Sequence, residues 1–339
     1  MTQLPPRPDP DQLRRQAKDL LRSARSNDSA SLSRLAGVPA GLTLSAAQFA
    51  LAREHGFPSW VALIQEVERR RTLDRGRPGE VRQMLARDSR LASIGMTAWA
   101  DHPNGVSPLS YIAMRPFDTS RRRWGRPTAN AGVVEALLRA GAPVDGLPTD
   151  RESPLITAAS YGSTEVARAL IDAGANIHRV ASLDSGGVPG GTALLHAAVF
   201  GSTAIVDLLR DAGATPASIE EAAALGNVAD WVDPVPPEDA RVRALAMAAD
   251  HERLDVIDCL IALGTPLDAT DARFGRQALR LAAARGRTGS VAHLLARGAD
   301  PSLRDEHGRS ALMLCRDAKQ HSTTAGHDAV ARLLEHFTT

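Results

Sequence analysis

The 339-residue sequence has only two cysteines, Cys259 and Cys315. Two cysteines cannot build a disulfide framework, and no cysteine–histidine cluster has the spacing of a zinc site, so we expect no bound metal. Long apolar runs are also missing, because no stretch approaches the ~20 residues that cross a bilayer. The first residues show no apolar segment behind a basic start, which is the mark of a secretory signal. We therefore expect a cytoplasmic protein without a membrane span.

The sequence also lacks the short motifs of common enzyme classes. It contains no nucleophile elbow (G-x-S-x-G), no zinc-protease H-E-x-x-H, no phosphate-binding P-loop and no dinucleotide fingerprint. The glycine-rich stretch at 185–191 is not followed by a strand–helix unit with a basic phosphate partner, so it predicts a flexible loop. We expect no cofactor.

Neither sign of charge is in large excess, and lysine is scarce. The net charge is +1, and Lys18 and Lys319 are the only lysines among 40 basic residues. Residues 1–78 hold 13 Lys/Arg against 8 Asp/Glu, or +5, while the remainder holds 27 against 31, or −4. This mild asymmetry is typical of a solvated surface, so nucleic acid is not the expected partner. If the protein does bind nucleic acid, the basic stretch 121–126 and the basic N-terminal helix are the expected contact sites.

What the sequence does contain is a repeated pattern within an ordinary globular composition, 43% apolar and 23% charged. Pairs of adjacent alanines recur along it, and Ile112-Ala113 occupies the same slot. Successive pairs lie 46, 39, 25, 26 and 34 residues apart, which scatters around the ~33-residue period of one repeat class. The alanine pairs are Ala158-Ala159, Ala197-Ala198, Ala222-Ala223, Ala248-Ala249 and Ala282-Ala283.

These copies resemble ankyrin repeats. The segment SPLITAASYGSTEVARALIDAGA at 153–175 is similar to the family pattern T-P-L-H-x-A-A-x-x-G-H, and the resemblance spans roughly 79–335. It implies an all-α ankyrin-repeat solenoid of about seven irregular repeats with inserted loops. The small alanines let neighbouring helices approach closely, and a glycine reverses the chain between the two helices of a repeat. One such unit cannot bury its apolar face alone, so stacking creates one continuous core.

The first 78 residues differ from the array at 79–339 and are similar to the helical module that precedes some bacterial ankyrin arrays. Residues 11–26 place apolar side chains on one stripe, and 44–71 predicts two helices interrupted at 56–59. Ser59 is expected to cap the second helix, and Phe57 and Trp60 are expected in the core. The simplest role of this module is to cap the open end of the stack.

The array departs from its pattern in several places. The fourth position of the family motif holds no histidine in any copy. The repeat around Ala222 is expected to lose most of its second helix because three prolines follow it at 233–240. Long connections of this kind tend to be binding loops or flexible insertions. They are 92–105, 115–130, 181–190, 233–240 and 316–329.

The resemblance implies a protein-interaction module that presents a rigid concave surface to a cytoplasmic protein. In such arrays the recognition surface is usually formed by the inter-repeat fingers and the exposed part of the first helices. The residues directly before the turn position of each repeat lie there, and Tyr161, Phe200 and His251 are expected to be exposed to solvent. The partner-binding candidates are Tyr161, Phe200, Leu225, His251 and Arg285.

A second hypothesis is a small-molecule-binding protein or a non-redox enzyme of the isomerase, lyase or cyclase type. Its candidate catalytic residues are His196, Glu221, Asp250 and His251, which come from consecutive repeats, and Tyr161 could join them. Imidazole near a carboxylate can hold a proton near neutral pH. The connections 92–105 and 181–190 would roof the site. The plain alternative is a polar, solvated groove.

Overall fold

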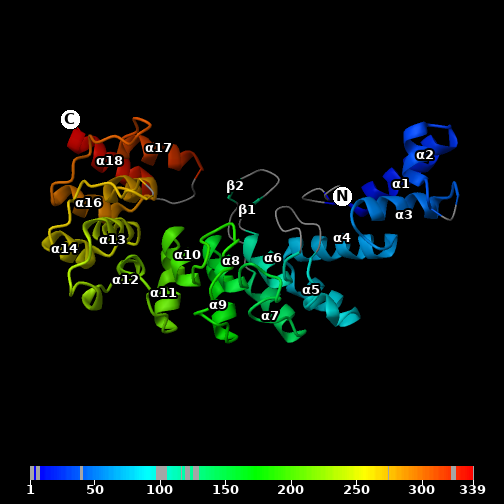
Figure 1. The fold of residues 1–339 in the computed structure, drawn as a ribbon, viewed down its shortest axis with the longest axis horizontal. Helices are drawn as coiled ribbons and strands as arrows, with labels where there is room; N and C mark the ends of the chain where they lie inside the picture. The colour runs from blue at the N-terminus through cyan, green and yellow to red at the C-terminus, as the bar shows by residue number, and fades with distance from the viewer. Residues whose placement is uncertain are drawn as a thin grey trace. The chain divides into compact units, whose positions relative to one another are not determined.

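A computed structural model describes residues 4, 8–38, 41–96, 105–115, 117–118, 123–124, 130–273, 275–321 and 326–338. The chain divides into two compact units, Met1–Pro154 and Leu155–Thr339. Both are built from short helices (Figure 1). Within the described residues the only strands are β1 (Phe117–Asp118) and β2 (Arg123–Trp124), a small antiparallel pair inside the predicted insertion. The predicted all-helical repeat fold is confirmed, and this hairpin is a local addition to it.

The first unit begins with a helical group that has its own apolar cores. The apolar stripe of α1 is buried against α3, as predicted, and Asp9 caps α1 by accepting from the main-chain N–H of Asp11 and Gln12. Ser59 Oγ accepts from the Ala62 N–H at 3.1 Å and caps α4, and Phe57 is buried. Both predictions are confirmed, and Trp60 is half-buried between the two cores. The helices are α1 (Pro10–Arg25), α2 (Ser29–Leu35), α3 (Leu44–Glu54), α4 (Trp60–Arg75), α5 (Pro78–Arg87), α6 (Pro108–Met114) and α7 (Ala131–Arg139), with a 3-10 turn η1 (Ser89–Ala92).

A buried arginine joins α4 to the segment that follows α5. Arg69 is almost fully buried and pairs with Glu66 at 2.9 Å. Its guanidinium donates to the carbonyls of Ile94 at 2.9 Å and Gly95 at 3.1 Å. Further along α4, Asp74 accepts from the hydroxyl of Tyr111 in α6 at 2.7 Å. The helices around residue 78 therefore share polar contacts, and a module boundary at that residue stays a prediction.

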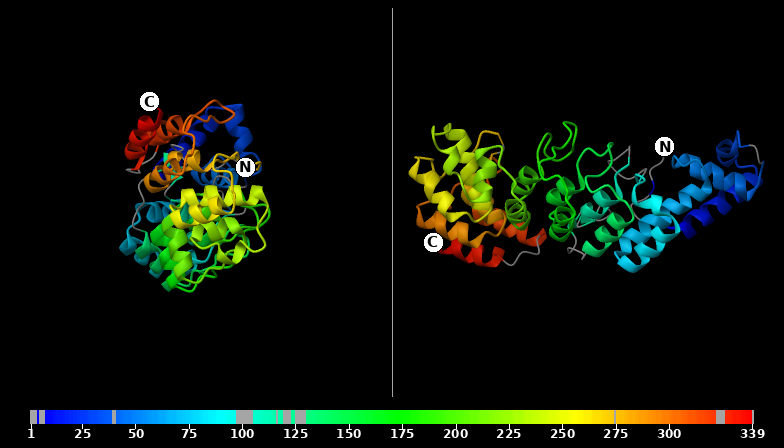
Figure 2. Two further views of the ribbon diagram at one scale, coloured as in Figure 1. Left: turned by 90° about the vertical axis from the view of Figure 1, so that its left-hand side faces the viewer. Right: turned by 90° about the horizontal axis from the view of Figure 1, so that it is seen from below.

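The second unit is a row of helix pairs (Figure 1, Figure 2). The expected alanine pairs lie at the ends of the first helices and are fully buried, so neighbouring repeats pack at close range. One apolar core runs from Ile219 to Leu334. The first helices are α8 (Pro154–Ser160), α10 (Ala193–Val199), α12 (Ile219–Leu225), α13 (Glu238–Asp250), α15 (Ala278–Ala284) and α17 (Ala311–His321). The second helices are α9 (Thr164–Asp172), α11 (Thr203–Asp211), α14 (Leu254–Ala262), α16 (Thr288–Ala296) and α18 (Gly326–Thr338).

The repeat of α12 lacks its second helix, as predicted. A three-residue 3-10 turn, η2 (Ala229–Trp231), stands in its place. Pro234, Pro236 and Pro237 follow, and each removes a main-chain donor that a helix would need. The next helix, α13, starts directly afterwards at Glu238. The repeat of α12, which lies between those of α10 and α13 in the chain, therefore contributes only one full helix.

We predict that Arg69→Ala lowers the stability of the first unit by roughly 1–3 kcal/mol, because it leaves buried carbonyls without donors, while Arg70 still pairs with Glu66 at 3.0 Å. Hydrogen exchange of peptides spanning 60–114 during urea unfolding measures this loss. Arg75→Ala is the matched control on the same helix, since Arg75 pairs with Glu80 at 3.0 Å on the surface and should contribute below ~1 kcal/mol. Equal effects of the two substitutions would contradict the structural role of Arg69.

Candidate functional site

Four first helices of the second unit, α8, α10, α12 and α15, end in carbonyl groups that accept hydrogen bonds from a later repeat. The last carbonyls of a helix have no partner within the helix. Ser202 Oγ donates to the Ala159 carbonyl at 3.2 Å, and Arg253 Nε donates to the Ala224 carbonyl at 2.7 Å. His327 Nε2 donates to the Ala284 carbonyl at 3.1 Å. All three donors lie at the start of a second helix. The repeat pattern in the sequence did not predict a role for this position.

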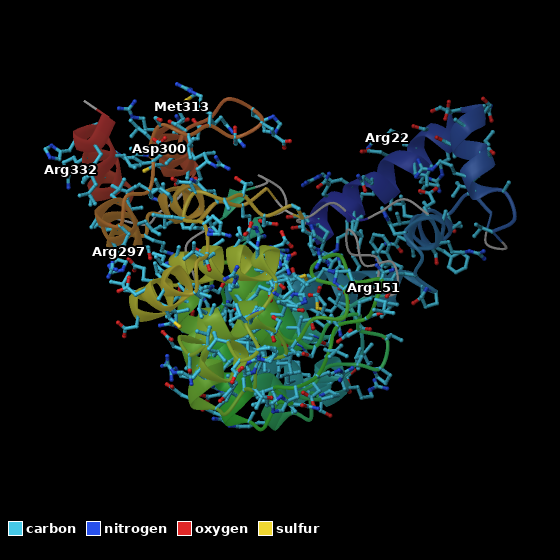
Figure 3. All side chains as sticks on the ribbon, turned by 60° about the vertical axis from the view of Figure 1, so that its left-hand side comes forward. Arg22, Arg151, Arg297, Asp300, Met313 and Arg332 are labelled. Carbon is cyan, nitrogen blue, oxygen red and sulfur yellow. The ribbon has the colours of Figure 1, made fainter. Side chains whose placement is uncertain are left out.

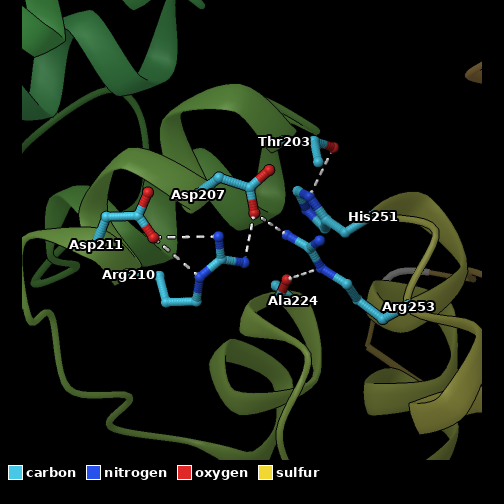
Figure 4. Close-up of polar contacts among 7 residues, drawn as sticks. All are labelled: Thr203, Asp207, Arg210, Asp211, Ala224, His251 and Arg253. Atoms are coloured by element: carbon cyan, nitrogen blue, oxygen red, sulfur yellow. Dashed lines mark hydrogen bonds and ion pairs between the residues drawn. The ribbon is translucent and has the colours of Figure 1, made fainter.

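Where the second helix is missing, the repeat of α13 and α14 contacts α10 and α11 directly. Arg253 forms an ion pair with Asp207 of α11, which also pairs with Arg210 at 2.9 Å (Figure 4). His251 Nε2 donates to the Ala198 carbonyl of α10 at 2.9 Å. Since Nε2 carries the hydrogen, Nδ1 is the acceptor for Thr203 Oγ1 at 3.0 Å. We call the contacts of His251 and Arg253 with α10–α12 the seam.

A buried carboxylate extends the seam toward α15. Asp250 is fully buried, with Arg287 Nε at 3.3 Å from Oδ1 and Arg285 Nε at 3.5 Å from Oδ2. Arg287 also donates to the Gly201 carbonyl at 2.7 Å. Gly201 has φ of +71°, and a Cβ there would lie 3.0 Å from Asp250 Oδ2 and 3.1 Å from Arg285 Cζ. Only glycine fits both the backbone conformation and the space at this position.

His196 is fully buried and fastens the inter-repeat finger 177–192 to two first helices. Its Nε2 donates to the Val188 carbonyl of that finger at 3.0 Å, and its Nδ1 accepts from Ser160 Oγ of α8 at 2.7 Å. Its ring lies 6.2 Å from the ring of Phe200, centroid to centroid. Burial lowers the pKa of His196 to about 4, so the ring is neutral near pH 7 and is a weak base.

Glu221 lies in the first turn of α12 and caps the start of that helix. Its carboxylate accepts from Thr192 Oγ1 at 3.2 Å and from the main-chain N–H of Ala217. Ser218 Oγ accepts in turn from the Glu221 N–H at 3.2 Å, which resembles a capping box. Burial raises the pKa of the Glu221 carboxyl. This group is therefore engaged in capping α12.

The four candidate catalytic residues, His196, Glu221, Asp250 and His251, are all buried, and each has its own set of contacts. Burial lowers the pKa of His251, as it does for His196, and so opposes a protonated imidazole. Of the two connections expected to roof a site, 92–105 is described only at its two ends, because 97–104 lies outside the described residues. The other, 181–190, supplies the Val188 carbonyl to His196.

The predicted exposure of the partner-binding candidates is correct in part. Phe200 is 38% exposed, the side chain of Arg285 is 39% exposed, and Tyr161 and Leu225 are half-buried. The prediction that His251 is exposed is wrong, because His251 is 1% exposed. His251 follows the last residue of α13, and its imidazole is covered where it contacts the Ala198 carbonyl of α10 and Thr203 Oγ1 of α11.

The described residues contain no group of three or more His, Cys, Asp or Glu side chains that could hold a metal ion. In the same part of the chain, no helix is both long and apolar enough to traverse a membrane.

The helix pairs, the turn glycines and the buried alanine pairs can now be compared with known proteins. A family model described as ankyrin repeats (3 copies) matches residues 128–219. Residues 128–219 are ankyrin repeats. Solved structures similar to it include the crystal structure of the human ASB11 ankyrin repeat domain, with 23% identity and a TM-score of 0.31 over 67% of this chain and 97% of that chain. No curated protein matches the chain.

We predict that Gly201→Ala destabilises the ankyrin array more than Gly213→Ala. Both glycines have positive φ, so each substitution should cost about 1–2 kcal/mol from the left-handed backbone alone. At Gly213 an added Cβ meets no atom within 4 Å, whereas at Gly201 it meets Asp250 and Arg285, which adds roughly 1–3 kcal/mol. Urea unfolding measures the difference, and equal losses would contradict the tight packing at Gly201.

The buried histidines predict a loss of stability in acid. His196 has an ordinary pKa of 6.5 and a pKa of about 4 in the folded chain. As the pH falls below about 6.5 the unfolded chain binds the proton first. Stability is therefore full above pH 6.5 and falls toward pH 4, by about 3 kcal/mol for this group.

Unfolding of the wild type and His196→Gln between pH 8 and 4 measures this contribution, since the variant should lose less stability in that window. His178→Gln, at an exposed position of the same unit, is the control and should follow the wild type. Parallel curves for His196→Gln and the wild type would exclude His196 as a source of the pH dependence.

Proposed function

We propose that the ankyrin array is a protein-binding module whose contact surface is formed by the fingers and the groove ends of the first helices. The observation that carries this proposal is where the unit exposes large apolar side chains. Five of them lie in fingers or at first helices, and exposed apolar groups of this kind are typical of interaction sites. They are Val180, Leu183, Phe200, Leu303 and Met313; Met313 lies at the periphery of the unit (Figure 3).

Two of these residues are well suited to act as anchors. Leu183 is 84% exposed in finger 177–192, whose base is closed by a bridge between Val180 and Thr192. Phe200 sits at the end of α10 and packs on His196, which is itself held at both ring nitrogens. A side chain that is already held in place loses little entropy on binding. The surface is therefore prepared before the partner arrives.

The N-terminal helices, in this proposal, cap the first repeats. Arg69 and Asp74 of α4 bind polar groups of the segment 91–95 and of α6, which supports a structural role for that helix. The partner is proposed to be a protein of the same compartment, and the cytoplasm stays the predicted compartment.

The test is capture of binding proteins by the full chain from a lysate of its source cells, followed by titration of the purified partner. Leu183→Ser and Phe200→Ser should each raise the Kd about tenfold, since well-packed apolar anchors contribute ~1–2 kcal/mol or more. Val235→Ser is the matched control, because Val235 is also exposed but lies in the proline-rich loop. A Kd that stays unchanged in both Leu183→Ser and Phe200→Ser would contradict the proposal. A small metabolite retained in place of any protein would favour the hypothesis of a small-molecule site.

A further inference from the structure

The second unit is acidic overall but has a basic cluster on the side of α15. Residues 155–339 hold 17 Lys/Arg against 23 Asp/Glu, or −6. Within this unit Arg285 and Arg287 surround one buried carboxylate, that of Asp250. Arg276 lies within electrostatic range of both Arg285 and Asp250, and its own acidic neighbour is Asp271. At Asp250 itself, two guanidinium groups pair with one carboxylate, which balances only one of the two positive charges.

The excess charge is directed to solvent at Arg285. Asp250 is fully buried, and the side chain of Arg287 is 21% exposed, while that of Arg285 is 39% exposed. Arg287 alone keeps Asp250 paired, at 3.3 Å, and is also fixed by the Gly201 carbonyl. If Arg285 turns to a second anion, Arg287 still pairs with Asp250 Oδ1, and Oδ2 has no hydrogen bond to lose.

Arg285 lies beside the aromatic anchor. Its Nη2 contacts the Val199 carbonyl at 3.5 Å, and its Cζ lies 3.1 Å from the point where a Cβ of Gly201 would be. Val199 and Gly201 flank Phe200 in the chain, so the guanidinium lies against the backbone on both sides of Phe200. A planar guanidinium next to an aromatic ring suits a ligand that has a carboxylate beside an apolar side chain.

We propose that this site binds an acidic segment of the partner protein, with an Asp or Glu carboxylate on Arg285 and a neighbouring apolar side chain on Phe200. This proposal deepens the proposed function and rests on it. Charge complementarity selects the ligand, because a basic segment would meet the excess positive charge, and an uncharged segment would leave Arg285 without its new partner.

The test starts with random peptides displayed on phage and selected on the full chain. We expect the selected peptides to share an Asp or Glu next to an aromatic or aliphatic residue. The strongest peptide is then synthesised with a fluorescent label, together with a copy in which Asp and Glu are replaced by Asn and Gln. Titration of both peptides against the wild type and Arg285→Gln forms a double-mutant cycle.

For the acidic peptide, Arg285→Gln should raise the Kd about tenfold or more. The amide peptide should bind wild type and Arg285→Gln alike. Arg285→Lys should give an intermediate Kd, because it keeps the charge and loses the planar fork. Arg297→Gln is the matched control: Arg297 is a similarly exposed arginine on α16, at the outside of the same unit, and pairs with Asp258 (Figure 3). It should leave the Kd unchanged. Thermal unfolding of Arg285→Gln close to that of the wild type shows that the fold is retained.

Three results would overturn the proposal: selected peptides without acidic residues, additive effects in the cycle, or a poly-dT oligonucleotide that binds through Arg285 while peptides do not. These outcomes are distinct from failure of the proposed function. If Phe200→Ser weakens the captured protein but Arg285→Gln does not, protein binding stands and the acidic ligand is wrong. If the full chain binds neither a protein nor a peptide, both proposals fail.

Discussion

The second unit depends on finding donors for the carbonyl groups at the ends of its first helices. These helices are short, so several of the carbonyls in each have no partner within the helix, and stacking then removes them from water. Each buried carbonyl left without a donor costs about 1–3 kcal/mol. Ser202, Arg253 and His327 supply donors from the repeats that follow. The stack is therefore held by directed polar contacts as well as by its apolar core.

The loss of one second helix changes which donors can serve. Between two complete repeats, those of α8 and α10, the short side chain of Ser202 is enough to reach the Ala159 carbonyl. Across the incomplete repeat of α12, the longer side chains of His251 and Arg287 reach the carbonyls of Ala198 and Gly201. Arg253 adds an ion pair to Asp207 on the far side of the gap. Side-chain length thus compensates for an absent helix, and this accounts for the concentration of arginine and histidine at the seam.

The same change of neighbours explains what the sequence could predict and what it could not. Alanine pairs, the proline-terminated repeat and the Ser59 cap depend on local chemistry, so they can be recognised residue by residue. The burial of His251 depends on which helix lies opposite, and a repeat period assumes that every slot has the same neighbour. Glu252 illustrates the point: it takes the turn position with φ of +54°, where other repeats have glycine, and accepts from the Gly289 N–H at 2.8 Å. The buried Arg69 lies in a helix whose pattern reads as charged and exposed.

The residues that hold the stack also shape the surface that we propose binds a partner. His196 contacts both Phe200 and the finger through one neutral ring. Protonation in acid would keep the Nε2 donation to the Val188 carbonyl but would turn Nδ1 from an acceptor into a donor toward Ser160 Oγ. Asp250 has two arginines, and this duplication matters physically. A single arginine could not bind an external carboxylate without competing against the buried one, at a cost of several kcal/mol. With Arg287 retained on Asp250, Arg285 is available to a ligand while the interior keeps its ion pair. Rigidity and binding are compatible at this site because Arg287 stays on the buried carboxylate.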